Sequence, residues 1–115
     1  MADILLYVHD FQLGTEISEQ FIRLDKTVEF FNTLPAVKTR IPNETAIVIL
    51  DLDEDDFNSA DLISYIRNFR PDIMIYGFKR TISKRIHEEL KNAGCDLIFP
   101  RSSFIKNLPG LIDRL

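Results

Sequence analysis

A cluster of acidic residues follows directly on an apolar run near the middle of the chain. The apolar run is Ile47–Leu50, and the acidic residues are Asp51, Asp53, Glu54, Asp55 and Asp56. Carboxylates at the end of a buried strand can hold a cation and accept a phosphoryl group, or they can form a charged loop that keeps the strand soluble. We interpret Asp51 as a pocket residue because it ends the strand. We interpret residues 53–56 as a solvated loop whose side chains point away from the pocket, because runs of like charge normally face water.

The spacing of Asp51, Asp53 and Asp55 is also similar to that of a calcium-binding loop. An EF-hand loop needs Gly at its sixth position and Glu at its twelfth, whereas this chain has Asp56 and Leu62 there. The sequence therefore excludes an EF-hand.

Other residues of interest follow three further apolar runs. They are His9, Asp10, Gly77 and Arg101. His9 is interpreted as a polar rim residue because no second His or Cys lies near it in the sequence. The pairs Lys79-Arg80 and Lys84-Arg85 start a helix and are interpreted as a solvated helix face rather than as a docking surface for an acidic partner.

Five short apolar segments predict β-strands. They are Ile4–Val8, Thr27–Phe31, Ala46–Leu50, Ile73–Tyr76 and Leu97–Phe99. The first has no alternation of apolar and polar residues, which is typical of a strand covered on both faces. The third is the most apolar, and we expect it to be central in the sheet.

Between these strands, and after the last of them, apolar residues recur at helical spacing. The predicted stripes are Ile17, Phe21 and Leu24 beyond Gly14; Leu62, Tyr65, Ile66 and Phe69; Ile82, Ile86, Leu90 and Ala93; and Leu108, Leu111, Ile112 and Leu115. A short helix is predicted over Pro35–Ile41. Asn58 or Ser59 is expected to cap the third helix, Gly94 to end the fourth, and Asn107 to cap the last with Pro109 in its first turn.

Strict alternation of strands and helices predicts a parallel sheet with right-handed crossovers and helices on both faces. Ligands in this architecture bind beyond the carboxyl ends of the strands. We therefore expect Asp10, Asp51, Gly77 and Arg101 to lie at one end of the sheet.

The strand ends resemble those of response-regulator receiver domains. Val8-His9-Asp10-Phe11 is similar to the Val-Asp-Asp after the first receiver strand, with His in place of the first Asp. Leu50-Asp51-Leu52 falls where receivers carry their phosphoacceptor Asp. The segment Gly94–Ser102 is similar to the receiver approach Gly-Ala-Asp and its Lys-Pro end, with Arg101 in place of Lys. The resemblance covers essentially the whole chain and implies one domain over residues 1–115 with a flavodoxin-like, doubly wound five-stranded parallel sheet in the order 2-1-3-4-5.

The resemblance also implies roles for the site residues. Asp51 is implied as phosphoacceptor, and Asp10 and Asp51 as a weak magnesium site, because His9 is a poor ligand for a hard ion. Arg101 stands in place of the receiver Lys, and Gly77 in place of the Thr or Ser that follows the phosphoryl group. No other cofactor is implied.

The resemblance implies a stand-alone, atypical module of two-component signalling or a phosphorelay, not an enzyme, acting through protein contacts of the fourth helix, fifth strand and fifth helix. Its partner is a sensor kinase or another signalling protein, and dimerisation through the last helix is allowed by analogy. A net charge of −4 disfavours nucleic acid, a single Cys95 fits a reducing cytoplasm, and no apolar run is long enough for a membrane span.

Three alternatives stay open. One is a pseudo-receiver that works without phosphate. A second is a small haloacid-dehalogenase-like phosphatase with Asp51 as nucleophile and Asp53 as general acid, although that motif normally lies on the first strand. The weakest is a flavin-binding protein, because residues His9–Thr15 lack the composition of a phosphate-wrapping loop.

Overall fold

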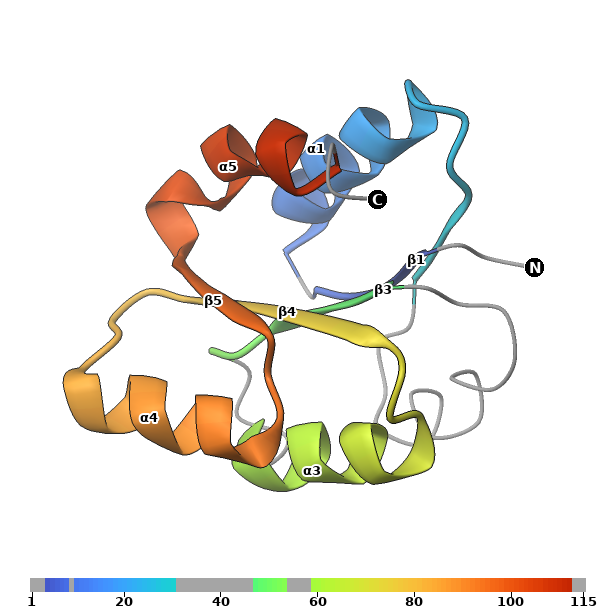
Figure 1. Cartoon of the computed structure of the whole chain (residues 1–115). Coiled ribbons are helices and arrows are strands. Elements are labelled where there is room, and N and C mark those ends of the chain that lie inside the picture. Colours follow the sequence, from blue (N-terminus) through green and yellow to red (C-terminus); the bar gives the residue numbers. More distant parts are fainter. Residues whose placement is uncertain (1–3, 9, 31–46, 54–58, 113–115) are drawn as a thin grey trace.

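The computed structural model describes residues 4–8, 10–30, 47–53 and 59–112, and these form one five-stranded parallel sheet with helices on both faces (Figure 1). The strands lie in the predicted order β2-β1-β3-β4-β5. Their bounds are β1 (Ile4–Tyr7), β2 (Val28–Phe30), β3 (Ile47–Asp51), β4 (Met74–Lys79) and β5 (Leu97–Pro100). The fold class predicted from the alternation and from the resemblance is confirmed.

Four α-helices and one 3₁₀ turn belong to the described residues. They are α1 (Phe11–Ile22), α3 (Ser59–Phe69), α4 (Lys84–Ala93), η1 (Arg101–Ser103) and α5 (Phe104–Ile112). Helices α1 and α5 cover one face of the sheet, and α3 and α4 cover the other (Figure 1). The helix predicted over Pro35–Ile41 lies outside the described residues. None of the described helices is both long and apolar enough to cross a membrane.

The strand β3 is central and buried along its whole length, as its composition predicts. It pairs with β1 on one side and β4 on the other. Because side chains alternate along a strand, Ile47 and Ile49 face the core under α1 and α5, whereas Val48 and Leu50 face the core over α3 and α4. Each face of β3 is thus fixed by a helical layer.

Helix α1 begins earlier than predicted. It starts at Phe11, and the Asp10 side chain caps it by accepting a hydrogen bond from the Leu13 backbone N–H at 3.1 Å. Gly14 therefore lies inside the helix rather than before it, where a Cβ would come within 3.0 Å of the Phe30 ring. Leu24, predicted to be buried, lies beyond the end of the helix and is exposed.

The buried stripe of α3 also differs from the prediction. Leu62 and Ile66 are buried as expected, but Ile63 completes the stripe. Tyr65 and Phe69 are exposed and stack on one another with ring centroids 6.3 Å apart. An i, i+4 aromatic pair on the solvent face has the same spacing as a core pair, so periodicity alone could not separate the two.

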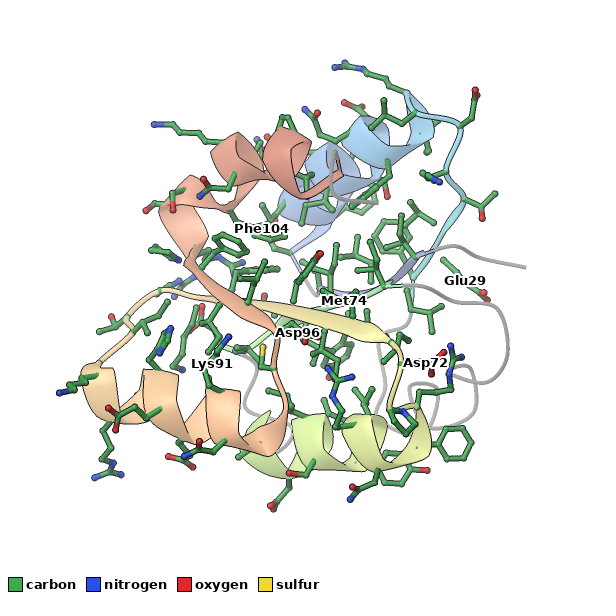
Figure 2. All side chains as sticks on the ribbon, viewed as in Figure 1. Glu29, Asp72, Met74, Lys91, Asp96 and Phe104 are labelled. Atoms are coloured by element: carbon green, nitrogen blue, oxygen red, sulfur yellow. The ribbon has the colours of Figure 1, made fainter. Side chains whose placement is uncertain are left out.

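The remaining helix ends include one success and one correction. Gly94 ends α4 with φ of 120°, the left-handed conformation for which glycine is favoured, as predicted. Helix α5 was expected to start after Asn107, but it starts at Phe104, so Pro109 lies inside it. Phe104 is fully buried between α5 and the sheet, and this contact explains the earlier start (Figure 2).

Candidate functional site

Asp51 is a buried carboxylate at the carboxyl end of the central strand. Its side chain is 2 % exposed. One oxygen, Oδ1, accepts a hydrogen bond from the Asp53 backbone N–H at 3.0 Å, and the other, Oδ2, accepts one from Arg101 Nη1 at 2.8 Å. A buried charge is tolerated when it is paired and hydrogen-bonded, and both oxygens of Asp51 meet that condition.

Arg101 lies where the turn η1 begins, directly after β5, and its side chain points back over the strand ends. Besides Asp51, its guanidinium approaches Asp10 Oδ2 at 3.5 Å from Nη2 and Asp53 Oδ2 at 3.5 Å from Nη1. Its Cζ lies 5.2 Å from the centroid of the Phe78 ring, a cation–π contact. One guanidinium therefore contacts three carboxylates and an aromatic ring.

The electrostatics of this cluster follow from its contacts. Burial disfavours the charge on Arg101, but its hydrogen bond to Asp51 and the charges of Asp51, Asp53 and Asp10 together hold the pKa of the guanidinium above its ordinary value. The Leu13 N–H, with a further contribution from Arg101, holds the pKa of the exposed Asp10 below its ordinary value. Both partners of the Asp10–Arg101 pair are thus charged at neutral pH.

The predicted convergence of the strand ends is confirmed for Asp10, Asp51 and Arg101. The roles assigned to them stay predictions. His9 lies outside the described residues, as do Glu54, Asp55 and Asp56 of the acidic loop.

The prediction for Asp53 is wrong. Its carboxylate does not point away from the pocket but accepts hydrogen bonds from the Arg80 backbone N–H at 3.0 and 3.3 Å. Lys79 Nζ lies 3.6 Å from Asp53 Oδ1. The Asp53 N–H donates a hydrogen bond to the Asp51 carboxylate, and this bond turns the chain back toward the pocket. An Asp side chain commonly accepts a hydrogen bond from the backbone N–H two residues further along the chain.

Gly77 is inside β4 rather than at its end, because the strand continues to Lys79. Gly77 pairs with Leu50 of β3 and Ile98 of β5. A Cβ at this position would lie 2.5 Å from Leu52 Cδ1, so its lack of a side chain makes room for the buried Leu52.

The residue at the carboxyl end of β4 is therefore Lys79, two residues beyond Gly77. That Gly77 stands in place of the receiver Thr or Ser stays a prediction. Lys79 Nζ lies 3.4 Å from the Leu52 carbonyl oxygen. Sequence reasoning missed Lys79 and Arg80 because it assigned them to a solvated helix start. The signal that could have found them is the apolar Phe78, which extends the strand beyond Gly77.

The geometry does not fit the predicted magnesium ion. Asp10 and Asp51 offer the oxygen donors that magnesium prefers, but the Arg101 guanidinium lies between them and contacts both. Within the part of the chain that the structure describes, no group of three or more His, Cys, Asp or Glu side chains could hold a metal ion. A divalent cation would have to displace Arg101.

Comparisons with known proteins show which solved structures have a similar fold. No family model matches the sequence, and no curated protein matches it significantly. The non-phosphorylated HemR receiver domain from Leptospira biflexa is similar in structure, with a TM-score of 0.86, 23 % identity, and 99 % of this chain and 93 % of that chain covered. A CheY-like receiver domain protein from Methanospirillum hungatei JF-1 is also similar, with a TM-score of 0.85, 19 % identity, and 96 % of this chain and 90 % of that chain covered.

A third similar structure is an atypical orphan response regulator, described as having a phosphorylation-independent regulatory mechanism. It has a TM-score of 0.81 at 17 % identity, with 96 % of this chain and 92 % of that chain covered. Together with the strand order and the strand-end cluster, these likenesses lead to one conclusion: this chain has the fold of the response-regulator receiver domains.

Proposed function

We propose that this chain is a receiver-like signalling module that acts through protein contacts and does so without phosphorylation of Asp51. The fold supports the signalling role. The ion pair between Arg101 and Asp51 carries the proposal that phosphate is not needed.

A phosphoacceptor carboxylate must turn a free oxygen toward the incoming phosphorus. Both oxygens of Asp51 already accept hydrogen bonds, from Arg101 and from the Asp53 N–H. A guanidinium stays charged at every physiological pH, so the pair persists. Arg101 Nη1 holds Oδ2 at 2.8 Å, so attack through that oxygen requires this pair to open first. Attack by Asp51 would start from that disadvantage.

The residue at the end of β4 gives further support. Receivers carry a hydroxyl near this point, and this chain carries the Lys79 ammonium. Its Nζ lies 3.4 Å from the Leu52 carbonyl oxygen and 3.6 Å from Asp53 Oδ1. The loop after β4, which would have to move, is also held by the hydrogen bond from the Arg80 N–H to Asp53. The ordinary conformational response to a phosphoryl group therefore lacks its usual parts. The atypical orphan regulator, a similar fold, is described as working without phosphorylation.

Phosphorylated Asp51 is the second candidate. It is favoured by one observation, which is that Asp51 is the last residue of the central strand, at the edge of the sheet beyond which ligands bind in this architecture. The phosphatase hypothesis is weaker because its general acid would be Asp53. The oxygens of that carboxylate are already engaged by the Arg80 N–H, and the Lys79 ammonium lies beside them.

The proposed partner is a sensor kinase or another signalling protein in the cytoplasm, bound through α4, β5 and α5, with a homodimer through α5 as a further option. No nucleic acid or membrane is included in the proposal, and neither is enzymatic activity.

The test is labelling with acetyl phosphate and MgCl₂, followed by intact-mass spectrometry. We expect the wild-type protein to gain no phosphoryl group under conditions that label an ordinary receiver domain treated in parallel. Asp51→Asn is the matched variant that identifies background labelling. Stoichiometric labelling that maps to Asp51 and disappears in Asp51→Asn would establish the second candidate instead.

A further inference from the structure

Three carboxylates converge on one guanidinium at the carboxyl ends of the strands. The contacting atoms are Oδ2 of Asp10, of Asp51 and of Asp53, which lie 3.5, 2.8 and 3.5 Å from the terminal nitrogens of Arg101. Asp51 is the last residue of β3 and Asp53 follows it, whereas Asp10 follows β1 and Arg101 follows β5. The shared contact of the three carboxylates is therefore a positive charge that the protein supplies itself.

The charges of the cluster are nearly balanced only because Arg101 is present. Asp10, Asp51 and Asp53 contribute three negative charges, and Arg101 and Lys79 contribute two positive ones. Without Arg101, three carboxylates would face one ammonium, which contacts Asp53 but neither Asp10 nor Asp51 among these three. Carboxylates held together in this way repel one another and attract a cation.

We infer that Arg101 is the built-in cation of this pocket: it takes the place of a divalent ion, makes the folded pocket indifferent to divalent cations, and hides a cation site that a neutral side chain at position 101 would uncover. This inference rests on the contacts of Arg101 and not on the absence of phosphorylation, so the two proposals can fail separately.

The position of Arg101 is fixed well enough for this role. Its guanidinium packs 5.2 Å from the centroid of the Phe78 ring, and its side chain is 15 % exposed. Phe78 pairs with Asp51 across the strands β3 and β4, so the ring and the carboxylate are held in register. The planar fork of an arginine reaches several carboxylates at once, which the single ammonium of a lysine cannot do in the same way.

The uncovered site would need some rearrangement. The described carboxylates, with Arg101 between them, form no group that could hold a metal ion. Asp10 is half exposed and caps α1 through only one oxygen, so its other oxygen can turn toward Asp51 once the guanidinium is gone, whereas Asp51 is fixed by the strand. Oxygen donors of this kind suit magnesium and calcium.

The experiment compares the thermal unfolding of the full chain and of Arg101→Gln in MgCl₂, in CaCl₂, and in NaCl of the same ionic strength. We expect the Tm of the wild-type protein to be the same in all three salts. We expect Arg101→Gln to have a lower Tm in NaCl and to gain roughly 5 °C in MgCl₂ or CaCl₂, the shift produced by a ligand present at about ten times its Kd.

Two variants serve as controls. Arg85→Gln removes one positive charge from the exposed face of α4 and should respond to the salts as the wild-type protein does. The double variant Arg101→Gln, Asp51→Asn removes one of the oxygen donors and should lose most of the divalent-cation shift. NaCl at matched ionic strength separates binding from general screening of the carboxylates.

The inference would be overturned if the wild-type protein were stabilised by MgCl₂ as much as Arg101→Gln is, or if Arg101→Gln folded and showed no difference between the salts. If Arg101→Gln does not fold in NaCl, MgCl₂ or CaCl₂ should restore a cooperative melt, and failure in every salt would equally overturn it. Labelling of wild-type Asp51 by acetyl phosphate would contradict the proposed function, while these salt responses would still decide the role of Arg101.

Discussion

At the scale of single residues, Asp10 has two distinguishable functions. One oxygen caps α1 through the Leu13 N–H, and the other faces Arg101. A hydroxyl can perform the first function and not the second. Asp10→Ser should therefore keep the cap and lose the charge, whereas Asp10→Ala should lose both and be the less stable of the two variants at neutral pH.

The charge of Asp10 predicts a pH dependence. Because the pKa of Asp10 is lowered in the folded protein, first by the Leu13 N–H and then by Arg101, its stabilising contribution is present above the unfolded-state pKa and is lost as the pH falls through the folded-state value. We expect Asp10→Ser to flatten the acid limb of stability below about pH 4. Urea unfolding at a series of pH values measures this, and an acid limb as steep as that of the wild-type protein would contradict it.

Gly77 and Leu52 form a second residue-scale pair. The Cβ of Gly77→Ala would come within 2.5 Å of Leu52 Cδ1, and overpacking of this kind costs about 1–3 kcal/mol. We expect Gly77→Ala to be less destabilising in a Leu52→Ala background than in the wild-type background, because the clash is gone. Chemical denaturation of the four proteins gives the coupling free energy, and additive effects would show that Leu52 moves aside at no cost.

At the scale of elements, Arg67 joins α3 to its neighbours. Its guanidinium donates hydrogen bonds to the carbonyl oxygens of Pro71, Ile73 and Gly94 and to Asp96 Oδ2 at 2.6 Å. Asp96 Oδ2 also accepts the Ile75 N–H at 2.7 Å. Figure 2 shows Asp96 at the start of β5, near Lys91 of α4. The cluster ties α3, the start of β4 and the end of α4 together.

We expect Arg67→Lys to destabilise the fold by about 1–3 kcal/mol, because one ammonium cannot replace a planar fork that serves four acceptors, and partly buried carbonyl groups would lose their donor. Arg85→Lys, on the exposed face of α4, is the control and should change stability by less than about 0.5 kcal/mol. Chemical denaturation measures both. Equal stabilities would mean that water replaces the lost bonds.

The element ends show where sequence reasoning succeeds. The cap of α4 was predictable because Gly94 has a local reason, its positive φ. The start of α1 also had a local signal, the Asp10 cap, but the sequence analysis assigned Asp10 to the pocket alone. The start of α5 had none, because Phe104 acts through its tertiary contact with the sheet. The extent of β4 was missed for the same reason, since Gly77 indicates a turn locally but is required by the Leu52 side chain.

The site follows the same pattern. Asp10, Asp51 and Arg101 could be brought together from the sequence, because the carboxyl ends of parallel strands share one edge. The inward turn of Asp53 could not, because it depends on the Arg80 N–H, which lies 27 residues away in the chain. The guanidinium's position between the carboxylates is likewise a matter of three-dimensional geometry.

At the scale of the whole molecule, stability depends on β3. Ile49 is fully buried in the core under α1 and α5, and a carboxylate there costs several kcal/mol, comparable with the roughly 5–15 kcal/mol that stabilises a whole domain. We expect Ile49→Asp to abolish the cooperative thermal transition seen by circular dichroism. Ile22→Asp, at an exposed position of α1, should keep a melt near that of the wild-type protein. A normal melt for Ile49→Asp would show that β3 is not central.

The pairing of the strands also constrains when the residues of the pocket come together during folding. No described strand pairs with a close neighbour in the chain: Ile4 pairs with Val28, Tyr76 with Leu97, and Ile4 with Ile47, which is 43 residues away. Closing a longer loop costs more entropy, and non-local pairing slows folding. The pairing of β1 with β3, which brings Asp10 beside Asp51, is the most distant of these. Asp10 and Asp51 therefore come together only through the described pairing that has the largest loop-closure cost, and the charge cluster cannot be complete before β1 and β3 have paired.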